Sequence, residues 1–184
     1  MNLKGVTLFL VGMMGAGKST TGQALAEKLG YKFFDTDAVI EQLAQQSISE
    51  IFQDSGEETF RELETKVLSE LSSYRQLVVA TGGGIVLKKM NWSYLRHGLV
   101  VWLDLSAEDL WERLKDDDSR PLLKTDNPLQ TLEDKLEERR ELYGQADVHV
   151  TIPGDADLET VQSLIWQAIQ PHLRKDPKSL DAES

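Results

Sequence analysis

Short apolar runs alternate with longer amphipathic segments along the whole chain, and this alternation limits the possible folds more than any other feature. The apolar runs are rich in Val, Leu and Phe and are mostly uninterrupted by polar residues, which is typical of strands buried on both faces. We expect strands at Val6–Val11, Tyr31–Phe34, Leu77–Thr81, Leu99–Leu103 and Val148–Ile152. The alternation predicts right-handed crossovers and a parallel sheet with helices on both faces.

The segments between the apolar runs show helical periodicity and several helix-boundary signals. We expect helices at Lys18–Leu29, Asp37–Gln45, Ser49–Gln53, Glu57–Ser72, Ser106–Lys115, Leu129–Tyr143 and Leu158–Leu173. Ser106 offers a hydroxyl for free backbone amides, with acidic residues in the first turn after it. Gly30 and Gly144 stand where two of these helices should end.

The length of the chain fits one domain. Its 184 residues are too few for two domains of ordinary size, and we expect a single domain over residues 1–174. The polar stretch Asp116–Pro128 carries two prolines and is predicted to be a mobile loop. Residues 175–184 are predicted to form a disordered tail.

Composition argues against several classes of function. Acidic residues outnumber basic ones by 31 to 20, a formal net charge of -11, which disfavours nucleic acid as a partner because phosphate backbones favour clustered Lys and Arg. The absence of Cys excludes disulfides and thiol chemistry. No apolar run approaches the roughly 20 residues of a membrane span. Glycines and a lysine follow the first apolar run in place of a signal-peptide cleavage site, so we expect a cytoplasmic protein.

A phosphate-binding loop is indicated directly after the first apolar run. Residues Gly12–Thr20 match the pattern G-x-x-x-x-G-K-[ST] between a predicted strand and a predicted helix. Glycines allow backbone N–H groups to point at phosphate oxygens, and the helix N-terminus adds its positive end. Lys18 would place its charge on the β- and γ-phosphates, and Ser19 would ligate Mg²⁺. The context disfavours the alternative, a glycine-rich turn without a ligand, and we expect a nucleoside triphosphate.

Two aspartates, Asp35 and Asp37, follow the second predicted strand. They should lie near the phosphate loop, because ligands of open α/β sheets bind beyond the carboxyl ends of the strands. One carboxylate could anchor metal-bound water while the other accepts a hydroxyl proton or orients the acceptor. In the structural alternative, Asp37 caps the helix starting at Ala38 and Asp35 is solvated. The preceding phosphate loop favours the functional interpretation.

Three consecutive glycines, Gly82, Gly83 and Gly84, end the third predicted strand. Because glycine costs backbone entropy, we expect the backbone there to approach a ligand closely. The alternative is a tight turn, which one or two glycines would satisfy.

Arginines near these motifs are candidates for a positive pocket in an acidic protein. They are Arg61, Arg113, Arg120, Arg139 and Arg140. Arg can bind a carboxylate or phosphate through two parallel hydrogen bonds, which Lys cannot. A surface ion pair is the alternative for each, and the acidic neighbours of Arg140 favour it there.

Taken together, the motifs resemble those of the shikimate kinase family, part of the nucleoside monophosphate kinase-like group. The resemblance covers roughly Leu3 to Ile169. It rests on Gly12–Thr20, Phe34–Asp37, Gly56-Glu57 with Phe60-Arg61, Thr81–Gly84, Arg120–Leu123, and Arg139 with Leu142-Tyr143. The phosphate loop alone is generic, whereas the combination is specific.

The resemblance implies an α/β fold: a five-stranded parallel sheet of order 2-3-1-4-5 flanked by helices, in a P-loop kinase three-layer sandwich with a mobile lid at about 116–128. It implies transfer of the γ-phosphate of ATP to the 3-hydroxyl of shikimate, giving shikimate 3-phosphate and ADP, a step of chorismate and aromatic amino acid biosynthesis. The implied cofactor is one Mg²⁺ ion, and the implied assembly is a monomer.

The resemblance also implies the roles of individual residues. The catalytic residues would be Lys18, Asp37 and Arg120, with Asp37 as the base and Arg120 reaching the transferring phosphate from the lid. ATP would be bound by Gly15, Ala16, Gly17, Lys18, Ser19, Thr20, Arg113 and Arg120, with Arg113 against the adenine. Shikimate would be bound by Asp37, Arg61, Gly82, Gly83, Gly84 and Arg139, with the two arginines on its carboxylate. Mg²⁺ would be held by Ser19 and, through water, by Asp35.

Some features depart from the family pattern, and two alternatives stay open. The lid begins with the acidic stretch Lys115–Ser119. The loop Pro153–Asp157 has Ala156 where we expect a polar or basic side chain, so an adenine contact there must come from backbone. The segment beyond Pro171 has no family role. A related small-molecule kinase such as a gluconate kinase would lack the combined arginine and glycine motifs. A catalytically dead regulatory paralogue would be credible only if Lys18, Asp37 or Arg120 were lost.

Overall fold

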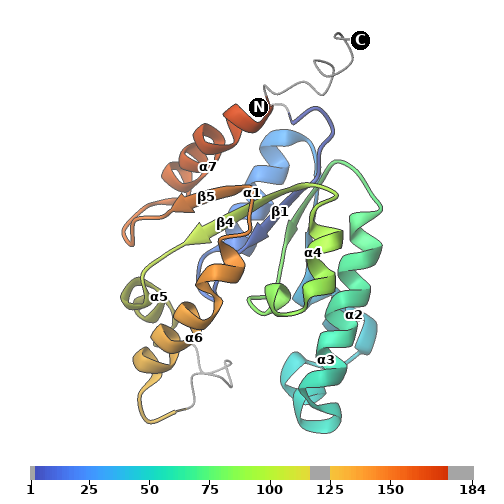
Figure 1. The fold of residues 1–184 in the computed structure, drawn as a ribbon, viewed down its shortest axis with the longest axis vertical. Helices are drawn as coiled ribbons and strands as arrows, with labels where there is room; N and C mark the ends of the chain where they lie inside the picture. The colour runs from blue at the N-terminus through green and yellow to red at the C-terminus, as the bar shows by residue number, and fades with distance from the viewer. Residues whose placement is uncertain (1–2, 117–124, 174–184) are drawn as a thin grey trace, which may run out of the picture.

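The computed structural model describes residues 3–116 and 125–173, which form a parallel sheet between layers of helices (Figure 1). The strands are β1 (Leu8–Val11), β2 (Lys32–Asp35), β3 (Leu77–Ala80), β4 (Leu99–Asp104) and β5 (Val148–Thr151). All neighbouring pairs are parallel, and the order is β2-β3-β1-β4-β5. This confirms the five predicted strands, each within two residues at either end, and the predicted order.

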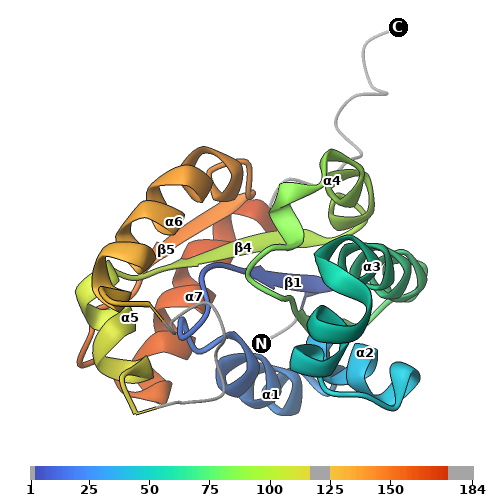
Figure 2. The ribbon, with the colours of Figure 1, turned by 90° about the horizontal axis from the view of Figure 1, so that it is seen from below.

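Helices cover both faces of the sheet. They are α1 (Lys18–Leu29), α2 (Thr36–Ala44), α3 (Ile48–Ser72), α4 (Lys89–Leu95), α5 (Ala107–Leu114), α6 (Pro128–Tyr143) and α7 (Leu158–Leu173), with a 3₁₀ turn at Ile85–Leu87. Helices α1 and α7 lie on one face, and α3, α4 and α6 lie on the other (Figure 2). Helix α4 and the 3₁₀ turn were not predicted from the sequence.

The boundary signals act largely as the sequence predicts. Gly30 ends α1 in the left-handed conformation, and Ser106 Oγ caps α5 by accepting a hydrogen bond from the Asp109 N–H. Gly56, with a φ of 82°, interrupts α3 between the two helical segments expected there. Gly144 follows α6 as predicted, although its conformation is right-handed.

The predicted lid and tail lie largely outside the described residues. The structure describes the lid region Asp116–Pro128 only at Asp116 and from residue 125 onward, and it describes nothing of residues 175–184. The single domain predicted for residues 1–174 stays a prediction. Within residues 3–116 and 125–173, no helix is both long enough and apolar enough to cross a membrane.

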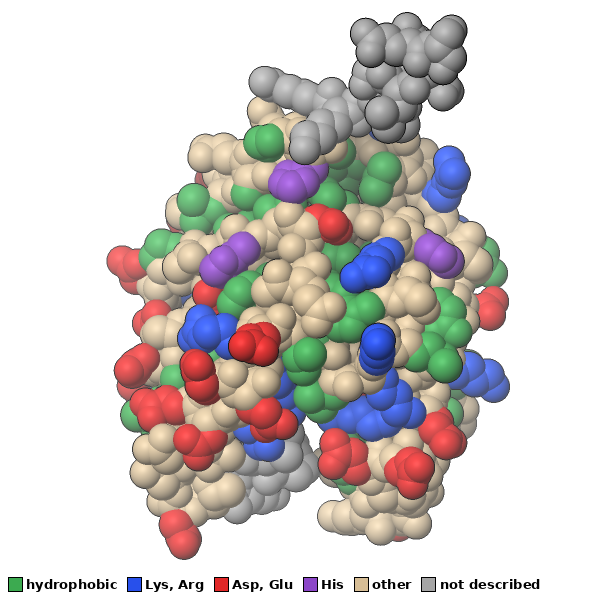
Figure 3. Space-filling model, in the orientation of Figure 1, with side chains coloured by type: hydrophobic (Ala, Val, Ile, Leu, Met, Phe, Trp, Pro, Cys, Tyr) green, Lys and Arg blue, Asp and Glu red, His purple; other side chains and the backbone are tan. Residues whose placement is uncertain are grey.

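The parallel strands direct their carboxyl ends to one edge of the sheet, and this edge positions the site. Strand β1 is the central strand, with β3 on one side of it, and all residues of these two strands are buried. Helices α5 and α6 project beyond the edge on one side, and α2 and α3 project on the other (Figure 1). Figure 3 shows a hollow between these projections, with Lys and Arg side chains gathered beside it and acidic side chains on the flanks.

Candidate active site

A cleft of about 540 Å³ lies beyond the carboxyl ends of β1, β2 and β3. We call it the main cleft. It is lined by ten of the predicted site residues: Gly15, Lys18, Ser19, Asp35, Asp37, Arg61, Gly82, Gly83, Gly84 and Arg139. The structure therefore brings together motifs that span more than a hundred residues of sequence.

The phosphate-loop motif forms the turn between β1 and α1. Gly15 and Gly17 have φ values of 79° and 81°, a conformation that favours glycine. No side chain caps the start of α1, so its first backbone N–H groups are available to an anion. The Lys18 ammonium group donates hydrogen bonds to the carbonyl oxygens of Gly12 and Met13 at 2.8 and 2.7 Å, which holds its charge at the loop.

Asp35 accepts three hydrogen bonds, two from the start of α2 and one from Ser19 of α1. Its Oδ1 accepts hydrogen bonds from the backbone N–H groups of Asp37 and Ala38 at 2.9 and 3.4 Å. Its Oδ2 accepts a hydrogen bond from Ser19 Oγ. The structural alternative, in which Asp37 caps the helix, is wrong in this detail: α2 begins at Thr36, so Asp35 is the cap.

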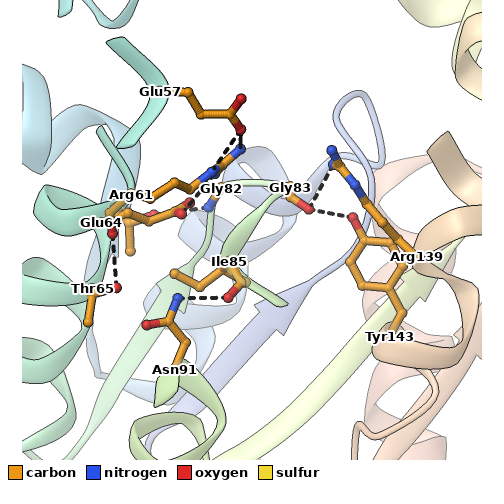
Figure 4. Close-up of polar contacts among 11 residues, drawn as sticks. Glu57, Arg61, Glu64, Thr65, Gly82, Gly83, Ile85, Asn91, Arg139 and Tyr143 are labelled. Atoms are coloured by element: carbon orange, nitrogen blue, oxygen red, sulfur yellow. Dashed lines mark hydrogen bonds and ion pairs between the residues drawn. The ribbon is translucent and has the colours of Figure 1, made fainter. Parts of the chain in front are cut away.

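Arg61 lies between two carboxylates on its own helix (Figure 4). Its Nη1 donates to Glu64 at 2.8 Å, and its Nε and Nη2 donate to Glu57 at 3.3 and 3.1 Å. Burial opposes the charged form of Arg61, but these carboxylates outweigh it and hold the Arg61 pKa above its usual value. Glu64 has no solvent exposure, and burial raises its pKa despite the neighbouring Arg61.

The glycines after β3 are required by close packing. A Cβ at Gly82 would lie 2.7 Å from both Asp37 Oδ1 and Glu64 Oε1, and a Cβ at Gly84 would lie 2.5 Å from Arg61 Cζ. The backbone N–H of Gly82 also donates to Thr36 Oγ1 at 3.0 Å. Side chains larger than hydrogen at Gly82 and Gly84 would therefore displace charged groups that line the main cleft.

Helix α6 contributes Arg139 and Tyr143 on the opposite wall. Both side chains donate to the carbonyl oxygen of Gly83, at 3.2 Å from Arg139 Nη1 and 2.6 Å from Tyr143 Oη (Figure 4). Arg139 is only 5% exposed, and Tyr143 is completely buried. Burial raises the pKa of Tyr143 to about 12, so the hydroxyl remains a donor at neutral pH.

A second hollow of about 460 Å³ adjoins the phosphate loop on its other side. We call it the side groove. Its lining includes Gly15, Ala16, Gly17, Thr20, Arg113, Gly154 and Ala156. Arg113 Nη2 donates to the Gly154 carbonyl oxygen at 3.1 Å. Every predicted site residue that the structure describes thus lines one of the two hollows, whereas Arg120 lies outside the described residues.

The expectation of a positive pocket needs correction. Four acidic side chains (Asp35, Asp37, Glu41 and Glu64) and three basic ones (Lys18, Arg61 and Arg139) line the main cleft. Both arginines are present, but the carboxylates of Glu57 and Glu64 compensate the charge of Arg61, so Arg61 lines the cleft as an ion-paired donor and not as an excess positive charge. Arg140 pairs with Glu137 at 3.1 Å, as the surface alternative predicted.

Several residues of the site were not identified from the sequence. Glu64 was not identified, although its position three residues after Arg61 places both on one helix face. Phe52 was not identified, and Phe60 was part of a motif but received no role. Both line the main cleft, and their rings lie 4.9 Å apart. Tyr143 was part of a motif but received no role, because nothing local in the sequence indicates its contact with Gly83.

The oxygen atoms of Ser19 and Asp35 fit a Mg²⁺ ion. They lie in contact at the edge of the phosphate loop, and hydroxyl and carboxylate oxygens suit this cation. Among the described residues, no group of three or more His, Cys, Asp or Glu side chains could hold a metal. This is compatible with Mg²⁺, which keeps several waters and binds through few protein ligands plus phosphates.

Comparisons with known proteins agree on one family. The model of the family described as shikimate kinase matches residues 14–170. A shikimate kinase of Synechococcus sp. (strain JA-3-3Ab) is 54% identical over 176 residues, which is 95% of this chain and 93% of the relative. A solved shikimate kinase from Acinetobacter baumannii, in complex with shikimate, is 39% identical, with a TM-score of 0.84, over 95% of this chain and 97% of that one.

A gluconokinase structure resembles the chain more distantly. The protein from Sinorhizobium meliloti 1021 has a TM-score of 0.54 and 20% identity, over 96% of this chain and 100% of that one. At this level the likeness shows a shared fold alone, so it gives no support to the gluconate kinase alternative.

Proposed function

This chain belongs to the shikimate kinase family, and from that premise we propose how its main cleft and side groove carry out the family reaction. The protein transfers the γ-phosphate of ATP to shikimate, giving shikimate 3-phosphate and ADP. The observation that carries the proposal is the meeting of the phosphate loop, Asp37, Arg61 and Arg139 in the main cleft.

Arg61 and Arg139 hold the carboxylate of shikimate. They come from α3 and α6, on opposite sides of the triple glycine, and both are largely buried. The Nε of Arg139 is buried and makes no hydrogen bond with the described residues, so this donor is available to an anionic ligand. Low exposure strengthens charge-assisted hydrogen bonds to a carboxylate.

Asp37 accepts the proton of the reacting hydroxyl. It lines the main cleft beside Lys18 and Ser19, where an acceptor hydroxyl and a terminal phosphate could meet. A loose phosphoryl-transfer transition state depends on positioning and charge neutralisation. Asp37 supplies orientation and basicity to the attacking oxygen, and Lys18 supplies positive charge to the phosphates.

The phosphate loop and the side groove bind ATP. Backbone N–H groups around Gly15, Gly17 and the start of α1 take the phosphates, and the adenine lies in the side groove against Arg113. Gly154, whose carbonyl oxygen accepts a hydrogen bond from Arg113, and Ala156 also line this groove. Arg120 reaches the transferring phosphate from the lid, by resemblance to the family.

Ser19 and, through water, Asp35 would hold one Mg²⁺ ion. When bound, it neutralises charge on the phosphate oxygens. The Ser19 hydroxyl would contact the ion, and Asp35 Oδ2 orients this hydroxyl by accepting its hydrogen bond. We further propose that the protein is a cytoplasmic monomer of one domain over residues 1–174, with no nucleic acid or membrane partner.

An acceptor panel tests the proposed function. Coupled ADP release with ATP and Mg²⁺ should be strong with shikimate and near background with gluconate or with shikimate lacking its carboxylate. Without the carboxylate, the arginines cannot position the hydroxyl, and positioning is worth up to roughly 7–11 kcal/mol in favourable cases. Strong gluconate turnover without shikimate turnover would overthrow the proposal. Equal turnover of shikimate and its decarboxylated analogue would overthrow only the arginine assignment.

A further inference from the structure

Tyr143 joins three parts of the site although it does not line the main cleft itself. Its hydroxyl donates to the Gly83 carbonyl oxygen at 2.6 Å and lies 3.8 Å from Met13 Sδ in the phosphate loop. Arg139 Nη1 makes the same pair of contacts, at 3.2 and 4.0 Å. A tyrosine and an arginine one turn apart on α6 thus share one acceptor.

We propose that Tyr143 is a positioning residue for shikimate: it holds the Gly83 carbonyl so that Arg139 presents its remaining donors to the substrate carboxylate. This inference rests on the proposed function of Arg139. The residue does not touch the substrate, and its effect passes through Gly83 and Arg139.

The Gly83 backbone is held on two sides. A Cβ at Gly83 would lie 3.3 Å from the backbone nitrogen of Met14 and 3.6 Å from the Gly12 carbonyl oxygen, so the phosphate loop packs closely against it. The Tyr143 hydroxyl contacts the carbonyl oxygen of the same residue. The backbone at Gly83 is therefore fixed between the phosphate loop and α6.

The guanidinium nitrogens of Arg139 differ in their hydrogen bonds, and this difference explains how the Tyr143 hydroxyl could affect the binding of the substrate carboxylate. Nη1 is directed at the Gly83 carbonyl, whereas the buried Nε has no hydrogen-bond acceptor among the described residues. If the Tyr143 hydroxyl were removed, Arg139 would be the main remaining donor to that carbonyl. The guanidinium would then move toward Gly83 and away from the geometry that a carboxylate requires.

The Tyr143 ring is anchored independently of its hydroxyl. It stacks on Trp102 of β4, with ring centroids 5.7 Å apart and an interplanar angle of 23°. Tyr143→Phe keeps this packing and removes only the hydrogen bond. Tyr31→Phe is a matched control, because the Tyr31 hydroxyl accepts a hydrogen bond from the Gly5 N–H at 3.0 Å. Tyr31 precedes β2, at the end of the sheet opposite the main cleft.

Steady-state kinetics with both substrates and thermal unfolding of each variant test the proposal. Tyr143→Phe should raise the KM for shikimate about 3- to 10-fold, the equivalent of one hydrogen bond, while the KM for ATP stays within about 2-fold of wild type. Tyr31→Phe should leave both KM values unchanged. A shikimate KM that does not change, or that rises only together with the ATP KM, would overturn the proposal.

A double-mutant cycle separates positioning from a general loss of stability. If Tyr143 acts through Arg139, adding Tyr143→Phe to Arg139→Lys should lower kcat/KM for shikimate less than about 2-fold further. If the effects of Tyr143→Phe and Arg139→Lys on kcat/KM for shikimate were fully additive, Tyr143 would not act through Arg139. This result would refute the proposal even if Tyr143→Phe alone behaves as expected. If the wild-type protein fails to phosphorylate shikimate, the proposed function is refuted. If the wild-type protein is active and Tyr143→Phe has the same shikimate KM, only the proposal for Tyr143 is refuted.

Discussion

The Glu64 carboxylate lies 2.8 Å from Arg61 Nη1 and is completely shielded from solvent. The two side chains stand three residues apart on α3, and the arginine lies flat against Gly84. Glu64 Oε1 accepts no hydrogen bond from the described residues, so this carboxylate depends strongly on Arg61. The position of Arg61, which we propose binds the shikimate carboxylate, is therefore set by a buried carboxylate that was not identified from the sequence.

Glu64→Gln should change the pH dependence of stability in a defined direction. Burial raises the Glu64 pKa in the folded protein above its usual value of 4.5. A raised acid pKa gives stability that is fully present below about 4.5 and is lost as pH rises through the folded pKa. Because Gln does not titrate, the free energy of unfolding of wild type relative to the variant should fall as pH rises from 4.5.

Urea unfolding of both proteins at several pH values between 4.5 and 9 measures this difference. The comparison cancels the contribution of carboxylates common to both proteins. A relative stability of wild type that increases with pH would show that Arg61 lowers the Glu64 pKa more than burial raises it.

Gly84→Ala should weaken shikimate binding without affecting ATP. The new Cβ would lie 2.5 Å from Arg61 Cζ, so the guanidinium must move away from its position in the main cleft. A displacement of about 1 Å at a positioning group can cost up to 10²-fold in kcat/KM. Separate kcat/KM measurements for shikimate and ATP check the result.

Gly30→Ala is the control for loss of stability in the Gly84 experiment. Gly30 ends α1 with a φ of 68° and has open space around its Cα. Alanine there should cost about 1 kcal/mol of stability and leave both kinetic parameters intact. If Gly84→Ala, like Gly30→Ala, left kcat/KM for shikimate unchanged, the close approach of Arg61 to Gly84 would have no catalytic importance.

Structural elements that are determined by residues close together in the sequence could be predicted from it. The strands follow from uninterrupted apolar runs, and the phosphate loop follows from glycine spacing between a strand and a helix. Helix α4 gives no comparable signal. It spans only seven residues and has no side-chain cap, and it is held by long-range burial of Trp92 and by the Asn91 side chain, which donates to the Ile85 carbonyl oxygen at 2.8 Å.

The missed site residues have the same physical explanation. In the sequence, Glu64 looks like one of many acidic residues on an exposed helix. Its burial depends on Gly82, which follows β3, and on Asp37, which lies in the first turn of α2. Charge compensation of Arg61 likewise depends on which face of α3 turns inward, so a positive pocket was expected where the structure has ion pairs.

Asp35→Asn should separate the helix-capping role of Asp35 from its proposed role in Mg²⁺ binding. Asn caps helices about as well as Asp, so the free energy of unfolding should change by less than about 0.5 kcal/mol. The amide would no longer offer Ser19 Oγ a charged acceptor. The Mg²⁺ concentration for half-maximal activity should rise about 10- to 100-fold, as for other residues that orient a metal ligand. If the Mg²⁺ concentration for half-maximal activity did not change, Asp35 would act only as the N-cap of α2 and not in Mg²⁺ binding.

Asp37→Asn should retain the fold and ATP binding but lose most turnover. The change is nearly isosteric and removes charge and basicity beside Lys18 in the main cleft. Loss of a general base and of its orienting effect costs on the order of 10² to 10⁴ in rate.

The matched control is Asp54→Asn. Asp54 is an exposed aspartate on α3 that accepts a hydrogen bond from Gln46 at 3.2 Å, and the variant should retain full activity. Coupled ADP release gives kcat, and titration calorimetry gives ATP affinity. Because Asn cannot take up the proton at any pH, raising the pH should not restore the rate. Turnover near the wild-type value, or a rate restored at high pH, would mean that another group accepts the proton and that Asp37 only contacts the substrate.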